Sequence, residues 1–265
     1  MAGNLKPIFL LADSQLLFWR DEDGQRFLER ARALIEAESP GKEPKAAYLG
    51  ASNGDAPEFF DLFVAAMAEI RIRDCRHIPS RPSNDDFAFL NEADLILLSG
   101  GDVRRGWQAF QESGLKEKIA ERYYAGAVLV GVSAGAVQLG LKGWDEGEVF
   151  DTFCLVPFVV DVHDEPNWTG LQRALPQAGE HARGFGIPGG AGALYHPDYS
   201  VEPVRSPLTE VERTESGMRQ SLLMPGAGET PESDEPTQVM SQEELVERVL
   251  RDLGPPGSDE DDPVN

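Results

Sequence analysis

The chain has few of the residues that would indicate a metal centre, a disulfide framework or a nucleic-acid surface. It contains two cysteines and four histidines among 265 residues, too few for repeated metal-ligand pairs or a set of disulfides. Lysine and arginine total 24 against 46 acidic residues, so no basic stripe is available to displace phosphate counterions. No apolar run approaches the ~20 residues of a membrane-spanning helix. We therefore expect a cytoplasmic protein with no metal, cofactor, nucleic-acid or membrane partner.

Much of the net charge of −22 lies in the last part of the chain. Residues 229–265 are acidic and proline-rich with few apolar side chains, a composition that cannot offset its own ordering entropy. One segment, residues 241–253, has the capping-box pair Ser241 and Glu244 and a helical stripe (Leu245, Val246, Val249, Leu250 and Leu253). We predict a folded domain at 1–228 and an acidic, largely disordered tail at 229–265. A short helix at 241–253 would dock on the domain, bind a partner or support a homodimer.

Strand-like and helix-like segments alternate through the first 140 residues. Strands are predicted at 7–12, 46–50, 72–78, 95–99 and 127–132, and helices at 24–38, 57–70, 84–93 and 115–126. This alternation predicts a parallel sheet covered by helices on both faces. The continuously apolar segments 95–99 and 127–132 should be its central strands. Later short strands, at 192–198, 210–216 and 219–226, indicate antiparallel additions at an edge. The predicted fold is a three-layer α/β sandwich with a mostly parallel central sheet.

The run Gly131-Val132-Ser133-Ala134-Gly135 has the layout of a nucleophile elbow. An apolar strand precedes it and small helix-forming residues follow at once. Such a sharp turn lifts a serine hydroxyl clear of the sheet and aims a helix N-terminus at the charge that develops beside it. Ser133 is therefore the candidate nucleophile.

A serine nucleophile needs a base to take its proton, and histidine is the usual one. His163 closes the apolar run 154–162, so we expect it at the same sheet edge as Ser133, with His196 as the second choice. An oxyanion hole needs two N–H donors. Ala134 supplies one through the elbow, and the Gly100-Gly101 turn after strand 95–99 can supply the other.

Two stretches resemble peptidase family S51, the serine peptidases that include dipeptidase E and cyanophycinase. Residues 95–136, with their Gly-Gly-Asp turn and Gly-Val-Ser-Ala-Gly-Ala motif, resemble the family's core. Residues 149–163 (VFDTFCLVPFVVDVH) resemble its strand that ends in the base histidine. The resemblance covers roughly residues 46–197 and implies a class I glutamine amidotransferase-like fold. It also implies that Ser133 is the nucleophile and His163 the base, with Gly101 and Ala134 forming the oxyanion hole.

The chain departs from the family where the family has its acidic residues. The family commonly carries a glutamate in a Gly-[Ile/Leu]-[Pro/Asp]-Glu-Gly turn near the histidine, and here that position is Gly189. The family also has an acidic residue between its serine and histidine. Four candidates stand in that segment here: Asp145, Glu146, Glu148 and Asp151. We take Asp151 and Glu148 as the first candidates for the orienting carboxylate, with the choice among all four open.

The residues after the histidine also differ. Dipeptidase E and cyanophycinase have phenylalanine there, then arginine-containing segments that recognise an acidic substrate group, whereas this chain has Asp164 and Glu165. Neutral or basic residues beside the scissile bond are therefore expected. The candidate substrate-binding residues are Gly100, Asp102, Glu165, Trp168 and Arg173. Trp168 would line an apolar pocket or cover the core.

Three functions compete at this stage. The leading hypothesis is a serine peptidase that cleaves a short peptide or isopeptide through an acyl-enzyme. The alternative is a non-catalytic binding or regulatory protein that keeps the fold but lacks a complete triad. An α/β-hydrolase esterase fits less well, because the order and spacing of a downstream Asp and His are poor.

Overall fold

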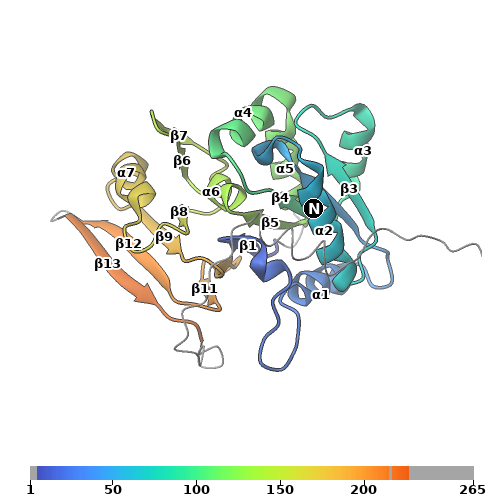
Figure 1. The fold of residues 1–265 in the computed structure, drawn as a ribbon, viewed down its shortest axis with the longest axis horizontal. Helices are drawn as coiled ribbons and strands as arrows, with labels where there is room; N and C mark the ends of the chain where they lie inside the picture. Colours follow the sequence, from blue (N-terminus) through green and yellow to red (C-terminus); the bar gives the residue numbers. More distant parts are fainter. Residues whose placement is uncertain (1–4, 215–216, 227–265) are drawn as a thin grey trace, which may run out of the picture.

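Seven strands form the central sheet, in the order β11-β10-β1-β5-β4-β2-β3. The computed structural model describes residues 5–214 and 217–226 (Figure 1). The strands of this sheet are β1 (Ile8–Leu11), β2 (Lys45–Leu49), β3 (Asp74–Ile78), β4 (Leu95–Leu98), β5 (Val128–Val132), β10 (Gly192–Tyr195) and β11 (Val201–Val204). The five strands from β1 to β3 in this order pair in parallel, while β10 and β11 add antiparallel at one edge. The predicted mostly parallel sheet with antiparallel edge strands is confirmed.

The two most apolar strands lie in the middle of the sheet, as expected. Every residue of β4 and β5 is buried, and Leu98 pairs with Gly131 where both strands end. On the other side of β5, Leu11 of β1 pairs with Val132. The ends of β1, β5 and β4 therefore meet at one carboxyl edge of the sheet.

Helices cover both faces of this sheet because its strands are apolar on both sides. In β1, Ile8 and Leu10 belong to one core cluster while Phe9 and Leu11 belong to another, as the alternation of side chains along a strand requires. The Phe9 face is covered by α1 (Glu29–Glu38) and α2 (Pro57–Glu69). The Ile8 face is covered by α3 (Asn84–Glu92), α4 (Val103–Ser113), α5 (Leu115–Tyr124) and α6 (Ala134–Leu139).

A second, four-stranded sheet in the order β13-β12-β9-β8 stands beside this sandwich, with α7 (Thr169–Ala178) against it (Figure 1). Its strands are β8 (Val159–Val162), β9 (Arg183–Ile187), β12 (Leu208–Thr214) and β13 (Gly217–Leu223). The expectation that strand 154–162 ends on the central sheet was therefore wrong. So was the expectation that segments 210–216 and 219–226 join its edge. The reason is that β8 is buried on both faces: Val160 packs in the core beside α6, and Val159 packs under α7.

Further elements connect these layers. The helices α4 and α7 were not predicted, although both are amphipathic. The short elements are the 3-10 helices η1 (Ser14–Leu17) and η2 (Ala51–Asn53) and the hairpin of β6 (Lys142–Trp144) and β7 (Val149–Asp151). None of the helices in the described ranges is long and apolar enough to cross a membrane. The predicted tail at 229–265, with its helix at 241–253, lies outside the described residues.

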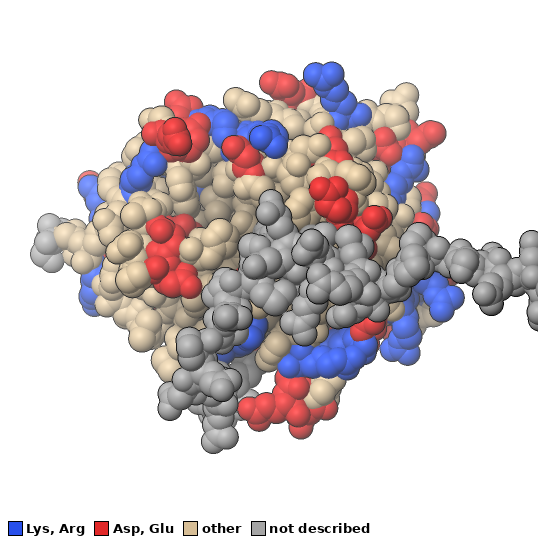
Figure 2. Space-filling model, viewed as in Figure 1, with Lys and Arg blue, Asp and Glu red and all other residues tan. Residues whose placement is uncertain are grey.

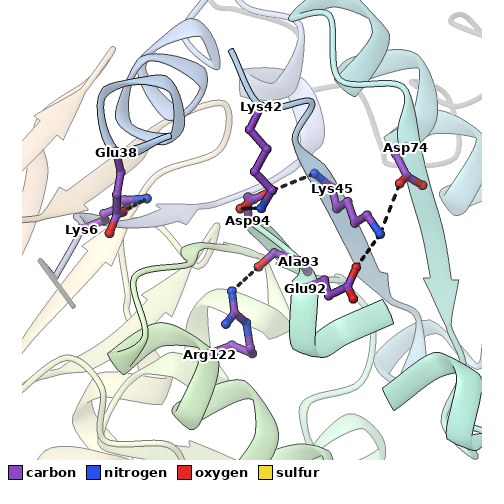
Figure 3. Close-up of polar contacts among 9 residues, drawn as sticks. All are labelled: Lys6, Glu38, Lys42, Lys45, Asp74, Glu92, Ala93, Asp94 and Arg122. Atoms are coloured by element: carbon purple, nitrogen blue, oxygen red, sulfur yellow. Dashed lines mark hydrogen bonds and ion pairs between the residues drawn. The ribbon is translucent and has the colours of Figure 1, made fainter. Parts of the chain in front are cut away.

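Ion pairs gather at the amino edge of the central sheet, opposite to the end of β5 that carries Ser133. Lys45 Nζ lies 2.6 Å from Glu92 Oε2, and Lys42 Nζ lies 3.0 Å from Asp94 Oδ1 (Figure 3). Asp94 Oδ2 also accepts the Lys45 N–H at 3.0 Å, which ties the start of β2 to the start of β4. On the face shown in Figure 2, acidic and basic side chains are interspersed. Lys42 and Lys45 therefore neutralise acidic neighbours at the amino edge, far from the carboxyl edge.

The buried Asp161 of β8 generates a prediction about stability. Its side chain is only 4% exposed, and burial raises the pKa of Asp161 from 3.8 to about 6. Between these pH values the folded state binds more protons than the unfolded state, so stability falls as pH rises. We expect wild type to lose about 2 kcal/mol relative to Asp161→Asn between pH 4 and pH 7. Urea unfolding of both proteins at several pH values measures this. Parallel pH profiles would contradict it.

Candidate active site

Ser133 occupies a strained turn between β5 and α6. Its backbone has φ 50° and ψ −111°, a conformation that non-glycine residues seldom adopt. The Ser133 N–H donates to Leu11 O at 2.9 Å, so the neighbouring strand β1 helps to hold the turn. Ser133 is 8% exposed and caps the start of α6. This is the geometry that the nucleophile-elbow motif predicts.

Gly135 of the motif is required by close packing. A Cβ atom at Gly135 would lie 2.2 Å from the carbonyl oxygen of Leu98, at the end of β4. The spacing of the motif therefore reflects the tight approach of α6 to the sheet beneath it.

His163 lies directly opposite the serine hydroxyl. Its Nε2 atom is 3.0 Å from Ser133 Oγ, a hydrogen-bond distance. The histidine follows β8, and its own N–H donates to Ile187 O of β9 at 2.9 Å. The nucleophile thus comes from the central sheet and its partner from the second sheet. The alternative base His196 instead pairs with Glu202 at 2.8 Å in the β10–β11 connection.

The two predicted oxyanion donors lie on the flanks of Ser133. Ala134 is the first residue of α6, and Gly101 follows β4 with φ 127°. A Cβ atom at Gly101 would lie 2.3 Å from Ser52 O, so only glycine fits this turn. Within residues 5–214 no hydrogen bond occupies the N–H of either residue. Their role as an oxyanion hole stays a prediction.

A buried amide network supports the Gly101 turn. Gln138 of α6 is fully buried, and its Nε2 donates to Val103 O at 2.9 Å and to Ser52 Oγ at 3.1 Å. Asp102 N–H donates to Ser52 O at 2.9 Å. These contacts join η2, the start of α4 and the helix that follows Ser133. Sequence reasoning missed Ser52 and Gln138, because a lone polar residue in a helix or loop gives no sign that it will be buried.

The predicted orienting carboxylates lie on the β6–β7 hairpin and pair with Lys142 of β6 and Arg104 of α4. Asp151 Oδ1 is 2.5 Å from Lys142 Nζ, and Glu148 Oε1 is 2.5 Å from Arg104 Nη2. Within the described residues neither carboxylate has a hydrogen bond to His163. The structure therefore does not bring Asp151 or Glu148 to the imidazole.

The predicted substrate-binding residues have different environments. Gly100 lines a cavity of about 30 Å³ beside Val132. Asp102 caps α4 by accepting the Arg105 N–H at 2.7 Å, and Arg173 is exposed on α7. Trp168 is 3% exposed and packs in the core under α7, the position of a residue that covers the core. Glu165 Oε1 accepts the N–H of Gly189 at 3.2 Å.

One further carboxylate at this edge was not predicted. Asp13 follows β1, is 7% exposed, and accepts the N–H of Gly190 on Oδ2 at 2.6 Å. Its position directly after the apolar run 7–12 is a signal that could have been used, since functional groups collect at the carboxyl ends of parallel strands. In the part of the chain that the structure describes, no group of three or more His, Cys, Asp or Glu side chains could hold a metal ion.

Comparison with known proteins agrees with this geometry. The sequence profile of peptidase family S51 matches residues 16–163, which include both Ser133 and His163. The chain belongs to peptidase family S51. The S51 match includes the β8 segment as well as the elbow, so it spans both sheets.

Individual relatives are more distant. An uncharacterized peptidase, YgaJ of Bacillus subtilis (strain 168), is 30% identical over 106 residues, which are 38% of this chain and 44% of that relative. The match thus spans less than half of the relative. A solved peptidase from an acI-B1 Actinobacterium has a TM-score of 0.60 at 15% identity, over 84% of this chain and 95% of that one. A putative peptidase E protein from Listeria monocytogenes EGD-e has a TM-score of 0.55 at 16% identity, over 76% of this chain and 98% of that one. These two structures are similar in fold.

The packing at the elbow predicts the effect of one added methyl group. In Gly135→Ala the new Cβ would collide with the backbone of β4, which cannot move aside as a flexible side chain could. We expect a loss of about 2 kcal/mol in unfolding free energy, measured with urea. The control is Gly147→Ala on the exposed β6–β7 turn, where the nearest atom would lie at 3.5 Å. Equal stability of the two variants would refute the packing argument.

Proposed function

We propose that this S51 protein is a serine peptidase that hydrolyses a short peptide or isopeptide through an acyl-enzyme. The observation that carries the proposal is the 3.0 Å contact between His163 Nε2 and a serine hydroxyl held on a strained elbow. A hydroxyl so placed, beside an imidazole and at the start of a helix, has a base for its proton and dipoles for the developing charge.

The proposed reaction begins with attack of Ser133 Oγ on the substrate carbonyl carbon. With its own proton on Nδ1, His163 accepts the hydroxyl proton on Nε2, and the N–H groups of Ala134 and Gly101 bind the oxyanion. The C–N bond then breaks and His163 returns the proton to the leaving amine. Water, deprotonated by the same imidazole, attacks the ester, and collapse of that intermediate releases the acid and restores Ser133.

The alternative is a binding or regulatory protein, and one observation favours it. Within the described residues no carboxylate accepts a hydrogen bond from His163, and Gly189 stands where the family commonly has glutamate. A base without an orienting carboxylate loses much of its advantage, about 10⁴-fold in a well-studied triad. The peptidase proposal therefore requires that backbone and packing contacts hold the imidazole instead.

A fluorophosphonate probe distinguishes the two functions without a known substrate. We expect it to label Ser133, with Oγ displacing fluoride from phosphorus and His163 taking the proton. Peptide mapping locates the adduct. Ser133→Ala should remove it and His163→Ala should slow it by several orders of magnitude. The matched control is Ser113→Ala, which alters the serine at the C-terminal end of α4. An unlabelled but folded wild type would favour the binding protein. Efficient turnover of nitrophenyl esters would favour an esterase.

The charge beside His163 generates a prediction about substrates. Asp164 Oδ2 accepts the N–H of Thr169 at 2.6 Å, and Glu165 accepts the N–H of Gly189, so both carboxylates are held in the loop that directly follows His163. An acidic residue beside the scissile bond would meet repulsion and lose hydration there, whereas a basic one would be attracted. Basic over acidic residues should be favoured at least about tenfold in kcat/KM.

A peptide library with varied residues on both sides of the scissile bond measures this preference. The matched variant is Glu165→Gln, which removes one negative charge but keeps an oxygen acceptor. This variant should have a smaller ratio of kcat/KM for basic over acidic residues than the wild type. Strong cleavage after aspartate by the wild type would overturn the prediction and require an arginine in the pocket.

A further inference from the structure

The nucleophile and its base stand on different sheets, so the distance between them depends on how the two sheets are joined. Ser133 ends β5 of the central sheet, and His163 follows β8 of the second sheet. The turn at residues 188–191 connects β9 of the second sheet to β10 of the central sheet. It begins beside His163, whose N–H donates to Ile187 O, and it ends beside β1, where Ala12 N–H donates to Ala191 O at 2.9 Å.

Two carboxylates hold the middle of this turn, one from each side. Glu165, two residues after His163, accepts the N–H of Gly189 at 3.2 Å. Asp13, at the end of β1, accepts the next N–H, that of Gly190, at 2.6 Å. Consecutive N–H groups are thus bound by carboxylates of the second sheet's loop and of the central sheet. Arg205 Nη1 donates to Gly190 O at 3.1 Å from the central-sheet side.

The two contacts differ in burial and in strength. Asp13 is 7% exposed, and its other oxygen accepts the Gln15 N–H at 2.8 Å, so this carboxylate is fixed by two backbone donors. Glu165 is exposed, and its longer contact is the weaker one. Since both acceptors are carboxylates, they differ in burial and in the second backbone donor and not in charge. Asp13 is therefore expected to be the principal holder of the turn.

We propose that Asp13 and Glu165 are positioning residues: by binding the N–H groups of Gly190 and Gly189, they hold His163 of the second sheet at hydrogen-bond distance from Ser133 of the central sheet. The inference rests on the proposed peptidase function, because the contacts are proposed to maintain the distance between Ser133 Oγ and His163 Nε2 that this function needs. A displacement of about 1 Å between reacting groups can cost about 10²-fold in rate, so a modest shift between the sheets is sufficient. Neither carboxylate needs to touch the imidazole for this effect.

The test compares truncation with isosteric replacement at both positions. Asp13→Ala and Glu165→Ala remove the acceptor, whereas Glu165→Gln keeps a carbonyl oxygen in its place. Asp13→Asn keeps only one of the two oxygens that bind backbone N–H groups, so it is a partial replacement. We expect Asp13→Ala to slow fluorophosphonate labelling of Ser133 by about tenfold or more and Glu165→Ala by about threefold or more. Glu165→Gln should stay within about twofold of wild type, and Asp13→Asn should lie between Asp13→Ala and wild type. Asp198→Ala is the control, since Asp198 also accepts a backbone N–H, from Ser200 at 3.0 Å, but in the β10–β11 connection.

Two spectroscopic readouts test the same contacts without chemistry at Ser133. Amide hydrogen exchange by NMR should quicken about tenfold at Gly190 in Asp13→Ala and to a smaller degree at Gly189 in Glu165→Ala. The ring ¹⁵N resonances of His163, assigned with a His163→Gln reference, should shift in the alanine variants and return in Glu165→Gln. Melting temperatures identify any variant that fails to fold. If Asp13→Ala does not fold, the comparison of Glu165→Ala with Glu165→Gln at this exposed position decides the proposal.

Several results would overturn the proposal. Unchanged exchange at both glycines would mean that the carboxylates do not hold the turn. Faster exchange with unchanged labelling and unchanged His163 resonances would mean that the turn does not position the dyad. Labelling of Glu165→Gln as slow as that of Glu165→Ala would show that negative charge is needed, not an acceptor. If wild type is not labelled at all, the peptidase function fails, while exchange and the His163 resonances still decide whether the turn positions the histidine.

Discussion

The contact between Ser133 Oγ and His163 Nε2 is the constraint on which the rest of this structure depends. It spans two sheets, so no single strand, helix or local motif can set its length of 3.0 Å. Each partner is fixed to its own sheet by a backbone hydrogen bond, Ser133 to Leu11 and His163 to Ile187. What remains free is the relation between the sheets, and α6 packs against both β5 and β8. The helix that the nucleophile caps is therefore also a spacer between nucleophile and base.

Charge is distributed along the central sheet in a way that suits this arrangement. At the amino edge, lysines are paired with acidic partners, as Lys42 with Asp94 and Lys45 with Glu92. Near the carboxyl edge, Asp13 of the central sheet and Asp164 and Glu165 of the loop after β8 accept backbone N–H groups instead. A carboxylate bound by N–H dipoles keeps its net charge while it organises a turn or a helix start. This region is consequently both ordered and negative, and within the described residues none of these three carboxylates forms an ion pair.

Sequence reasoning was sufficient for whatever a local pattern determines. The apolar runs of β4 and β5 indicated central strands, and the spacing of Gly131, Ser133 and Gly135 indicated the elbow, because strand burial and turn sterics depend on neighbouring residues. The second sheet could not be predicted in the same way. Its strand β8 is as apolar as a central strand, and nothing in residues 154–162 distinguishes burial within one sheet from burial between two layers. The expected partner His163 was found beside Ser133, yet it reaches that place from the second sheet.

The positions of the acidic residues also could not be predicted from their order in the sequence. Asp151 and Glu148 lie between Ser133 and His163 in sequence, but the β6–β7 hairpin turns them toward Lys142 and Arg104. Asp13 lies 120 residues before Ser133 and yet shares its sheet edge, because β1 and β5 are neighbours in the parallel sheet. A carboxylate missing at Gly189 therefore does not leave the turn without one. The N–H of Gly189 donates to Glu165 of the loop after His163, so the carboxylate at this turn comes from a different segment of the chain.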